Sequence, residues 1–227
     1  MSVSNQGFMN CHCFVNKCRP AAILLCLFAF LGARSYAQSL SGPELVSQLR
    51  QGGFVIVMRH ASSPRVLPDA SQANPDNVEH ERQLDLSGRL SATAMGEALR
   101  QLGIPIGSVL SSPTYRALET IRLAQFGYAN TFDNLGDMGQ SMQSDPDVER
   151  AAWLRSQTWT RPAGHTNTII VTHLPNITEA FPKDSEDLGD GEALVFRPDG
   201  RGAALLAARV KISEWPRWAA LLQRKSK

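Results

Sequence analysis

Cysteine is confined to one end of this chain. The four cysteines, Cys11, Cys13, Cys18 and Cys26, all precede residue 38, so the last 190 of the 227 residues (227 minus 37) contain none. A domain without cysteine can form no disulfide, no thiolate metal site and no cysteine nucleophile. Any chemistry in that part of the chain must therefore use other side chains.

Long hydrophobic runs are also missing. The longest apolar run, Ala21 to Leu31, is too short for a comfortable membrane span, which takes about 20 residues. Lys17 and Arg19 precede this run, and the small residues Ser35 and Ala37 follow it in the positions that precede a signal-peptide cleavage site.

This arrangement predicts a signal peptide over residues 1–37, cleaved near Ala37, and a single domain over residues 38–227. We expect the domain to be periplasmic or secreted and to keep no stable membrane anchor after cleavage. A retained anchor is the alternative, and Met9 is a second possible start.

An excess of charge of one sign is absent too. The chain has 23 basic and 21 acidic residues, and Lys17, Arg19 and Arg34 lie in the predicted signal peptide, which leaves 20 basic against 21 acidic residues. Aromatic residues make up 7% of the sequence and do not alternate with basic ones. This composition argues against nucleic-acid binding, so any anion must be bound by a local cluster.

Buried strands alternate with helical segments in the rest of the chain. Apolar, β-branched runs predict strands at 54–59, 108–112 and 168–172, and a hairpin is expected over 192–200 and 203–211. Helical spacing predicts helices at 43–50, 87–102, 113–124, 147–156 and 214–224, with Ser87 and Ser112 as caps. Leu90 is expected in the apolar stripe of the helix at 87–102, and Trp215 and Trp218 in the core. The polar stretch 62–82 is expected to be a lid or a disordered excursion. The pattern predicts an α/β fold, a three-layer α/β/α sandwich with a mostly parallel central sheet.

Polar residues follow each of the three predicted core strands. Arg59 and His60 end the first, Ser111 and Ser112 the second with Arg116 on the following helix, and His173 the third. The carboxyl ends of parallel strands share one sheet edge, so these side chains should converge. We also expect a helix start at Pro113 to supply free amides and a positive dipole end. Two arginines, two histidines and a helix start predict a phosphate site.

The same segments resemble the histidine phosphatase superfamily, with its phosphoglycerate-mutase-like fold, in the branch of small bacterial members. The resemblance rests on Met58-Arg-His-Ala61, Ser111-Ser-Pro-Thr-Tyr-Arg116, Val171-Thr-His173 and Leu84-Asp-Leu-Ser-Gly88. It spans residues 54 to 176, and these motifs in this order are highly specific. The continuation Ser62-Ser-Pro-Arg-Val-Leu-Pro68 differs from the Ser-x-Trp-Asn of the mutases, which favours a phosphatase.

The resemblance implies a covalent mechanism that needs no metal or other cofactor. His60 would attack the phosphorus and become a phosphohistidine, while Arg59 and Arg116 hold the phosphoryl oxygens. His173, protonated when phosphate is bound, would donate a further hydrogen bond. The expected substrate is a small phosphomonoester.

The proton donor and the other substrate contacts are less closely defined. Family members often take the acid from a Leu-x-Glu pattern, and Leu135-Gly-Asp137 occupies that place, so Asp137 is the candidate, with Asp133 and Asp145 as competitors. Ser62 and Arg65 after the first strand, and Asn176 after the third, are candidate substrate-binding residues. Each has a plainer interpretation as a loop residue.

Two other classes of function remain open. A non-catalytic phosphate-binding or adaptor protein would keep the same residues without turnover. A zinc hydrolase would use His60, His173 and Asp137 as ligands.

Overall fold

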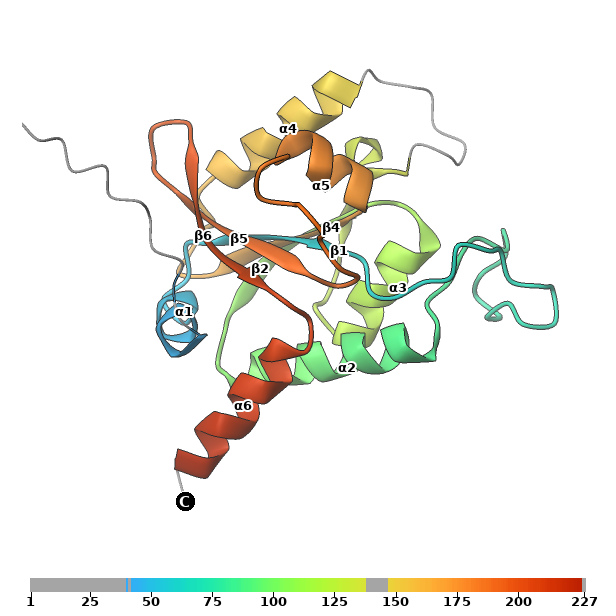
Figure 1. Cartoon of the computed structure of the whole chain (residues 1–227), viewed down its shortest axis with the longest axis horizontal. Helices are drawn as coiled ribbons and strands as arrows, with labels where there is room; N and C mark the ends of the chain where they lie inside the picture. Colours follow the sequence, from blue (N-terminus) through green and yellow to red (C-terminus); the bar gives the residue numbers. More distant parts are fainter. Residues whose placement is uncertain (1–39, 41, 138–146, 226–227) are drawn as a thin grey trace, which may run out of the picture. The chain divides into compact units, whose positions relative to one another are not determined.

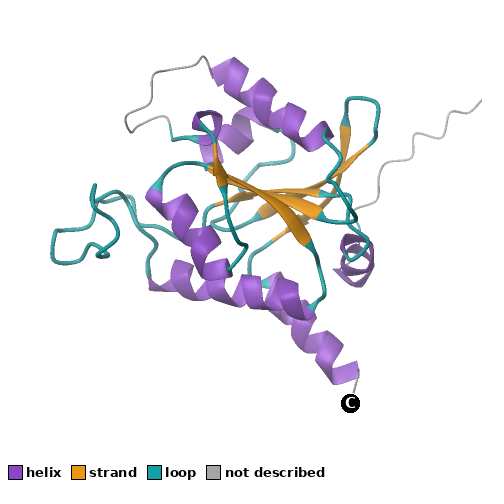
Figure 2. Ribbon diagram, turned by 180° about the vertical axis from the view of Figure 1, so that it is seen from behind, coloured by secondary structure: helices purple, strands orange, loops and turns teal. Residues whose placement is uncertain are grey.

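A computed structural model describes residue 40 and residues 42–137 and 147–225. These residues form an α/β fold in which a central sheet lies between two layers of helices (Figures 1 and 2). The three-layer sandwich predicted from the strand and helix pattern is confirmed.

The sheet has six strands in the order β3-β2-β4-β1-β5-β6. The strands are β1 Val55–Arg59, β2 Ile106–Ser111, β3 Asn130–Thr131, β4 Asn167–Thr172, β5 Ala193–Pro198 and β6 Ala204–Val210. The first four are mutually parallel, whereas β5 runs antiparallel to β1 and forms the predicted hairpin with β6. Because β1 lies between β4 and β5, both of its edges are paired and its residues 55–58 are buried.

Helices cover both faces of this sheet. They are α1 Gly42–Leu49, α2 Leu86–Gln101, α3 Tyr115–Ala124, α4 Asp147–Trp159, α5 Leu174–Ala180 and α6 Glu214–Lys225, with a short 3-10 turn, η1, at Asp133–Leu135. In Figure 1, α4 and α5 lie on one side of the sheet and α2, α3 and α6 on the other.

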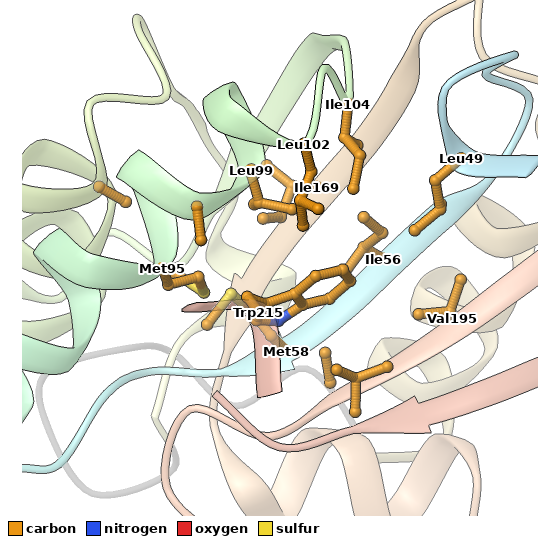
Figure 3. Close-up of a cluster of buried hydrophobic side chains, with 14 of the residues drawn as sticks. Leu49, Ile56, Met58, Met95, Leu99, Leu102, Ile104, Ile169, Val195 and Trp215 are labelled. Carbon is orange, nitrogen blue, oxygen red and sulfur yellow. The ribbon is translucent and has the colours of Figure 1, made fainter. Parts of the chain in front are cut away.

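The larger core lies between the sheet and α1, α2, α3 and α6 (Figure 3). Ile56 and Met58 project from β1 into it and meet Met95 and Leu99 of α2. Trp215 of α6 is 1% exposed in this core, as predicted, while Trp218 is only partly buried and packs edge-on against it. Alternation along β1 sends Val55 and Val57 to the opposite face, against α4 and α5.

Three local predictions about α2 and α3 are wrong. The N-cap of α2 is Asp85, whose carboxylate accepts a hydrogen bond from the Gly88 amide at 2.7 Å, rather than Ser87. Leu90 was expected in the apolar stripe of α2 but is 62% exposed, because the buried face is made of Ala92, Met95 and smaller residues. Helix α3 starts at Tyr115 with Thr114 as N-cap, two residues later than predicted.

The polar stretch after β1 is neither a free lid nor a disordered excursion. Its two ends run side by side: the Ser62 carbonyl accepts a hydrogen bond from the Asp85 amide at 3.1 Å, and the Ser63 hydroxyl donates to the Gln83 carbonyl at 2.9 Å. We refer to residues 62–85 as the β1–α2 loop. Neither the short strand β3 nor helix α5 was predicted; both are too short to show a clear period.

Candidate active site

The parallel register brings the ends of β1, β2 and β4 to one edge of the sheet. Arg59 is paired with Thr172, and Ser111 with Val171, so the residues that follow these strands are neighbours. The His60 amide donates to the Thr172 carbonyl at 3.0 Å, which continues the ladder past the strand end. The predicted convergence of His60, Arg116 and His173 is therefore present.

His60 is held with one ring nitrogen available for attack. The side chain is 3% exposed, and Nδ1 lies 2.7 Å from the carbonyl oxygen of Ala61. A carbonyl only accepts, so Nδ1 carries the proton and Nε2 keeps its lone pair. Burial, assisted by the charges of Arg116 and Arg59, lowers the pKa of His60 to about 3, although the bond to Ala61 acts in the opposite direction. The imidazole is neutral and nucleophilic at neutral pH.

Arg116 is the centre of the cluster. Its side chain is completely buried, and its Nε donates to His60 Nε2 at 3.3 Å while Nη2 donates to His173 Nδ1 at 3.2 Å. Nη2 also forms an ion pair with Asp137. Burial lowers the pKa of Arg116, and Asp137 counteracts this shift. Among the described residues, the buried Nη1 has no hydrogen-bond partner.

His173 faces His60 across the cluster. The two rings are 5.2 Å apart and edge-to-face. Since Nδ1 of His173 accepts from Arg116, its Nε2 carries the proton and donates to the Ser112 hydroxyl at 2.9 Å. Burial first, and then the charge of Arg116, lowers the pKa of His173 well below its usual value. With no anion bound, His173 is neutral; the protonated form was expected only with phosphate.

Arg59 is anchored by the connection between α5 and β5. Its Nη2 pairs with Asp190 at 2.7 Å, and Nη1 donates to the Leu188 carbonyl at 3.3 Å. Its buried Nε is the second guanidinium nitrogen that lacks a partner in the described part of the chain. Buried N–H groups are nearly always satisfied in folded proteins, so two orphan arginine donors mark a place for an anion.

Asp137 lies beside Arg116. The segment that carries it is fixed by Asn176 of α5, whose amide donates to the Gly136 carbonyl at 2.9 Å and to the Thr172 hydroxyl at 2.8 Å. Both amide hydrogens of Asn176 are thereby used, so it bonds the loop rather than a substrate. The competitor Asp133 is exposed in η1, and Asp145 falls outside the described residues.

The other two candidate substrate contacts have different positions. The Ser62 hydroxyl donates to the Asp85 carboxylate at 2.7 Å. Its single hydrogen is used in the cap of α2, which contradicts the expected donation to phosphate. Arg65 is exposed in the β1–α2 loop.

The expected anion site at the start of α3 is occupied by the protein itself. The Tyr115 amide donates to the Glu81 carboxylate at 2.9 Å, and the Thr114 amide donates to the Ser112 hydroxyl at 3.2 Å. Glu81 provides the negative charge that a helix N-terminus favours. These two amides are therefore not available to a phosphate, which corrects the sequence-based expectation.

Sequence reasoning overlooked Arg82. Its Nε and Nη2 donate to the carbonyls of Pro64 and Ser63 at 2.6 and 3.1 Å, and Nη1 takes part in neither bond. These two bonds hold the Arg82 guanidinium against the segment that follows His60. The charge of Arg82 contributes, after burial and Arg116, to the lowered pKa of both His60 and His173. The sequence feature that could have identified Arg82 is its position, two residues before Leu84-Asp-Leu-Ser-Gly88. That segment was one of the motifs on which the family resemblance rests.

The zinc alternative has no support in the ligand geometry. Within residues 42–137 and 147–225, no group of three or more His, Asp or Glu side chains is arranged to hold a metal ion. Asp137 is instead paired with Arg116. No helix in the same described ranges is long and apolar enough to span a bilayer.

Comparisons with known proteins agree with this architecture. No family model and no curated protein sequence matches the chain. Among solved structures, the protein histidine phosphatase SixA complexed with tungstate superposes with a TM-score of 0.52 at 18% identity, covering 71% of this chain and 98% of SixA. YhfR of Bacillus stearothermophilus has a TM-score of 0.49 at 17% identity, covering 68% of this chain and 95% of YhfR. The domain therefore has the fold of the histidine phosphatases, which the motifs around Arg59-His60, Arg116 and His173 had predicted.

Proposed function

We propose that this protein is a phosphatase that hydrolyses a small phosphomonoester through a phosphohistidine on His60, without a metal. The observation that carries the proposal is the buried Arg116 guanidinium, whose Nε lies 3.3 Å from His60 Nε2 and whose Nη1, like Arg59 Nε, lacks a partner in the described chain. Unpaired cationic donors at the same sheet edge as a neutral imidazole suit a phosphoryl group, whose charge lies on its equatorial oxygens.

In the first step, His60 Nε2 attacks the phosphorus as the bond to the leaving oxygen breaks. The Nδ1–H bond to the Ala61 carbonyl at 2.7 Å stabilises the positive charge that develops on the ring. Arg59, Arg116 and Arg82 neutralise the phosphoryl oxygens. The phosphoryl group would compete with Asp137 for Arg116. The released carboxylate would take the proton of the phosphomonoester monoanion and pass it to the leaving oxygen.

In the second step, water attacks phosphohistidine. Asp137, now a carboxylate, accepts a proton from the water, and the electron pair of the broken P–N bond returns to His60 Nε2. Inorganic phosphate leaves and the neutral imidazole is restored. His173, protonated while the phosphoryl dianion is present, would donate to one of its oxygens.

Export is part of the proposal. The predicted signal peptide over residues 1–37 supports a periplasmic or secreted enzyme. SixA is a protein histidine phosphatase, but at 18% identity its similarity supports a shared fold and not a shared substrate. A small exported phosphomonoester therefore remains the favoured substrate class over a phosphohistidine protein.

Trapping the covalent intermediate tests the function. The purified protein is incubated with an aryl phosphate, quenched, and analysed for acid-labile, base-stable phosphate. We expect a phosphoenzyme in the wild type, none in His60→Ala, and an unchanged level in His80→Ala, which alters an exposed histidine of the β1–α2 loop. Wild-type turnover no higher than that of His60→Ala would favour the non-catalytic phosphate-binding protein instead.

Inhibitors separate the remaining alternative. A phosphohistidine enzyme should be inhibited by vanadate and retain activity in a strong chelator. Loss of activity on chelation, restored by Zn²⁺, would support the zinc hydrolase.

A further inference from the structure

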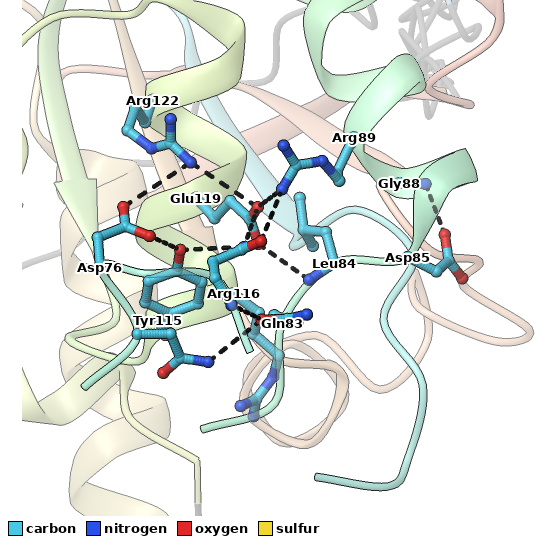
Figure 4. A network of polar contacts seen from close by, with 12 residues as sticks. Asp76, Gln83, Leu84, Asp85, Gly88, Arg89, Tyr115, Arg116, Glu119 and Arg122 are labelled. Carbon is cyan, nitrogen blue, oxygen red and sulfur yellow. Dashed lines mark hydrogen bonds and ion pairs between the residues drawn. The ribbon is translucent and has the colours of Figure 1, made fainter. Parts of the chain in front are cut away.

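A fully buried carboxylate joins the β1–α2 loop to the helices beneath it (Figure 4). Glu119 of α3 is 1% exposed, and its side chain lies among Leu84, Arg89 and Arg122 in the figure. It has no place in the chemistry proposed above, and it stands on the buried face of α3 beside apolar positions. A carboxylate in that position needs an explanation, because burying an ion is strongly unfavourable unless it is paired.

The partners of Glu119 come from three separate parts of the chain. Oε2 accepts from the Leu84 amide at 2.9 Å, and Oε1 accepts from Asn74 Nδ2 at 3.0 Å and from Arg89 Nη1 at 2.5 Å. Leu84 and Asn74 both belong to the β1–α2 loop, and Arg89 is on α2. Arg122, whose Nη2 lies 3.8 Å from Oε1, is on α3 itself, so two arginines provide the compensating charge. One carboxylate thus fixes both the middle and the end of the loop.

Glu119 is connected to Arg82 by its hydrogen bond with the Leu84 amide and two residues of backbone. Leu84 is two residues after Arg82, and the residue between them, Gln83, accepts from the Asn74 amide through its side chain at 2.9 Å. Arg82 in turn bonds the Ser63 and Pro64 carbonyls, which follow His60. The loop backbone on either side of Arg82 is therefore fixed by Glu119 at 84 and by Glu81 on the Tyr115 amide.

We propose that Glu119 is a positioning residue, which sets the place of the Arg82 guanidinium in the phosphoryl site by fixing the Leu84 amide and the Asn74 side chain. The inference rests on the proposed function only in so far as the site binds phosphate. Without the carboxylate, the Leu84 end of the segment 81–84 would lose its attachment to α3, and only the Glu81 bond to the Tyr115 amide would remain. Arg82 would then occupy several positions instead of one. Misplacing a charge-stabilising group by about 1 Å weakens the interactions that depend on it.

Phosphate binding and a double-mutant cycle test this role. The dissociation constant of inorganic phosphate is measured by calorimetry for wild type, Glu119→Gln, Arg82→Ala and the double variant. We expect each single variant to bind roughly tenfold more weakly, and the double variant to be no weaker than Arg82→Ala alone, because Glu119 acts through Arg82. Equal losses from Glu119→Gln in both backgrounds would overturn the proposal, since they would mean a general effect on the fold.

Two further variants guard against loss of folding. Asn74→Ala removes a loop contact of Glu119 from a half-buried position and should weaken phosphate binding in the same direction with little change in the unfolding midpoint. The control Glu97→Gln makes the same chemical change at an exposed position of α2 and should leave phosphate affinity unchanged. Unaltered affinity in both Glu119→Gln and Asn74→Ala would also contradict the inference.

Calorimetry with phosphate keeps this test separate from the test of function. If no phosphohistidine forms but phosphate binding still depends on Glu119 through Arg82, the positioning role stands and the catalytic proposal fails. If turnover is present and the cycle is additive, the opposite holds.

Discussion

At the scale of single residues, two neutral histidines coexist with three arginines at one sheet edge. His60 and His173 are buried next to Arg116, and burial together with that charge lowers the pKa of both. The site therefore has its positive charge only on guanidinium groups before an anion arrives. A protonated His60 would have no lone pair for attack, so the low pKa keeps the nucleophile available across the physiological range.

The lowered histidine pKa values predict how stability depends on pH. Below pH 6.5 an unfolded chain protonates His60, whereas the native state does not until about pH 3, so the unfolded state binds more protons in this window. The free energy of unfolding should fall as pH decreases from 6.5, by up to about 1 kcal/mol per pH unit for His60, and His173 adds in the same direction.

Urea unfolding between pH 7.5 and 5.5 measures this dependence. His60→Gln should flatten the slope, because it removes one of the two groups, while His80→Gln, at an exposed position, should leave the slope unchanged. A wild-type slope equal to that of His60→Gln would refute the prediction.

Asp137 has two possible contributions that one substitution separates. If it is the proton donor, Asp137→Asn should lower turnover of an alkyl phosphate by about 100-fold or more and that of p-nitrophenyl phosphate by less than about tenfold, because nitrophenolate leaves without a proton. Steady-state kinetics with both substrates decides. An equal loss on both would show that Asp137 serves mainly as the ion-pair partner of Arg116; Asp133→Asn, at an exposed position, is the control.

At the scale of secondary-structure elements, the contact between α2 and α3 sets where Arg116 and Glu119 lie. Helix α2 crosses α3 closely at Gly96, where an added Cβ would lie 1.9 Å from the Ala124 carbonyl oxygen. The obstacle is backbone, so it cannot turn aside as a flexible side chain would. A second close approach holds the β1–α2 loop, since a Cβ at Gly88 would lie 2.1 Å from the Ser62 carbonyl oxygen.

Gly96→Ala is accordingly expected to destabilise the protein. The forced separation of α2 and α3 should cost about 1–3 kcal/mol, which outweighs the gain of up to about 1 kcal/mol from the better helix former. Urea unfolding against Ser87→Ala, an exposed change in the first turn of the same helix, gives the comparison. Gly96→Ala as stable as wild type would mean that the two helices can separate without loss.

At the scale of the whole molecule, the described domain begins close to the predicted cleavage site. The Leu40 amide donates to the Ala207 carbonyl of β6 at 2.9 Å, and its side chain packs against the larger core. A chain that starts at Gln38 retains both interactions.

We therefore expect removal of residues 1–37 to leave the domain folded. The purified chain from Gln38 should unfold at the same midpoint as longer forms, and expression of the full sequence in bacteria should yield a periplasmic or secreted product whose mass corresponds to a start at Gln38. Ala37→Leu, which replaces the small residue before the cut, should accumulate the uncleaved form. Cytoplasmic, full-length protein in both cases would contradict export.

The polar strand ends are predictable from the sequence because the order of residues along the chain determines them. The apolar runs that predict the strands end at Arg59, Ser111 and Thr172. Parallel pairing of these strands then brings His60, Arg116 and His173 together at one edge of the sheet. The hairpin at the C-terminus and the positions of most helices follow from the same local periodicities.

Partners distant in the sequence depended on packing. Glu119 reaches Leu84 and Asn74 across 35 and 45 residues, and the Ser62 hydroxyl reaches Asp85 across 23. The local sequence shows that these side chains are polar. It does not show whether each one bonds a group of the protein, a ligand or solvent, because that depends on which part of the backbone lies next to it after folding. The sequence by itself thus determined that two histidines and Arg116 meet at one sheet edge, whereas the partners of Ser62, Glu81, Arg82 and Glu119 were decided by the close approach of the β1–α2 loop to α2 and α3.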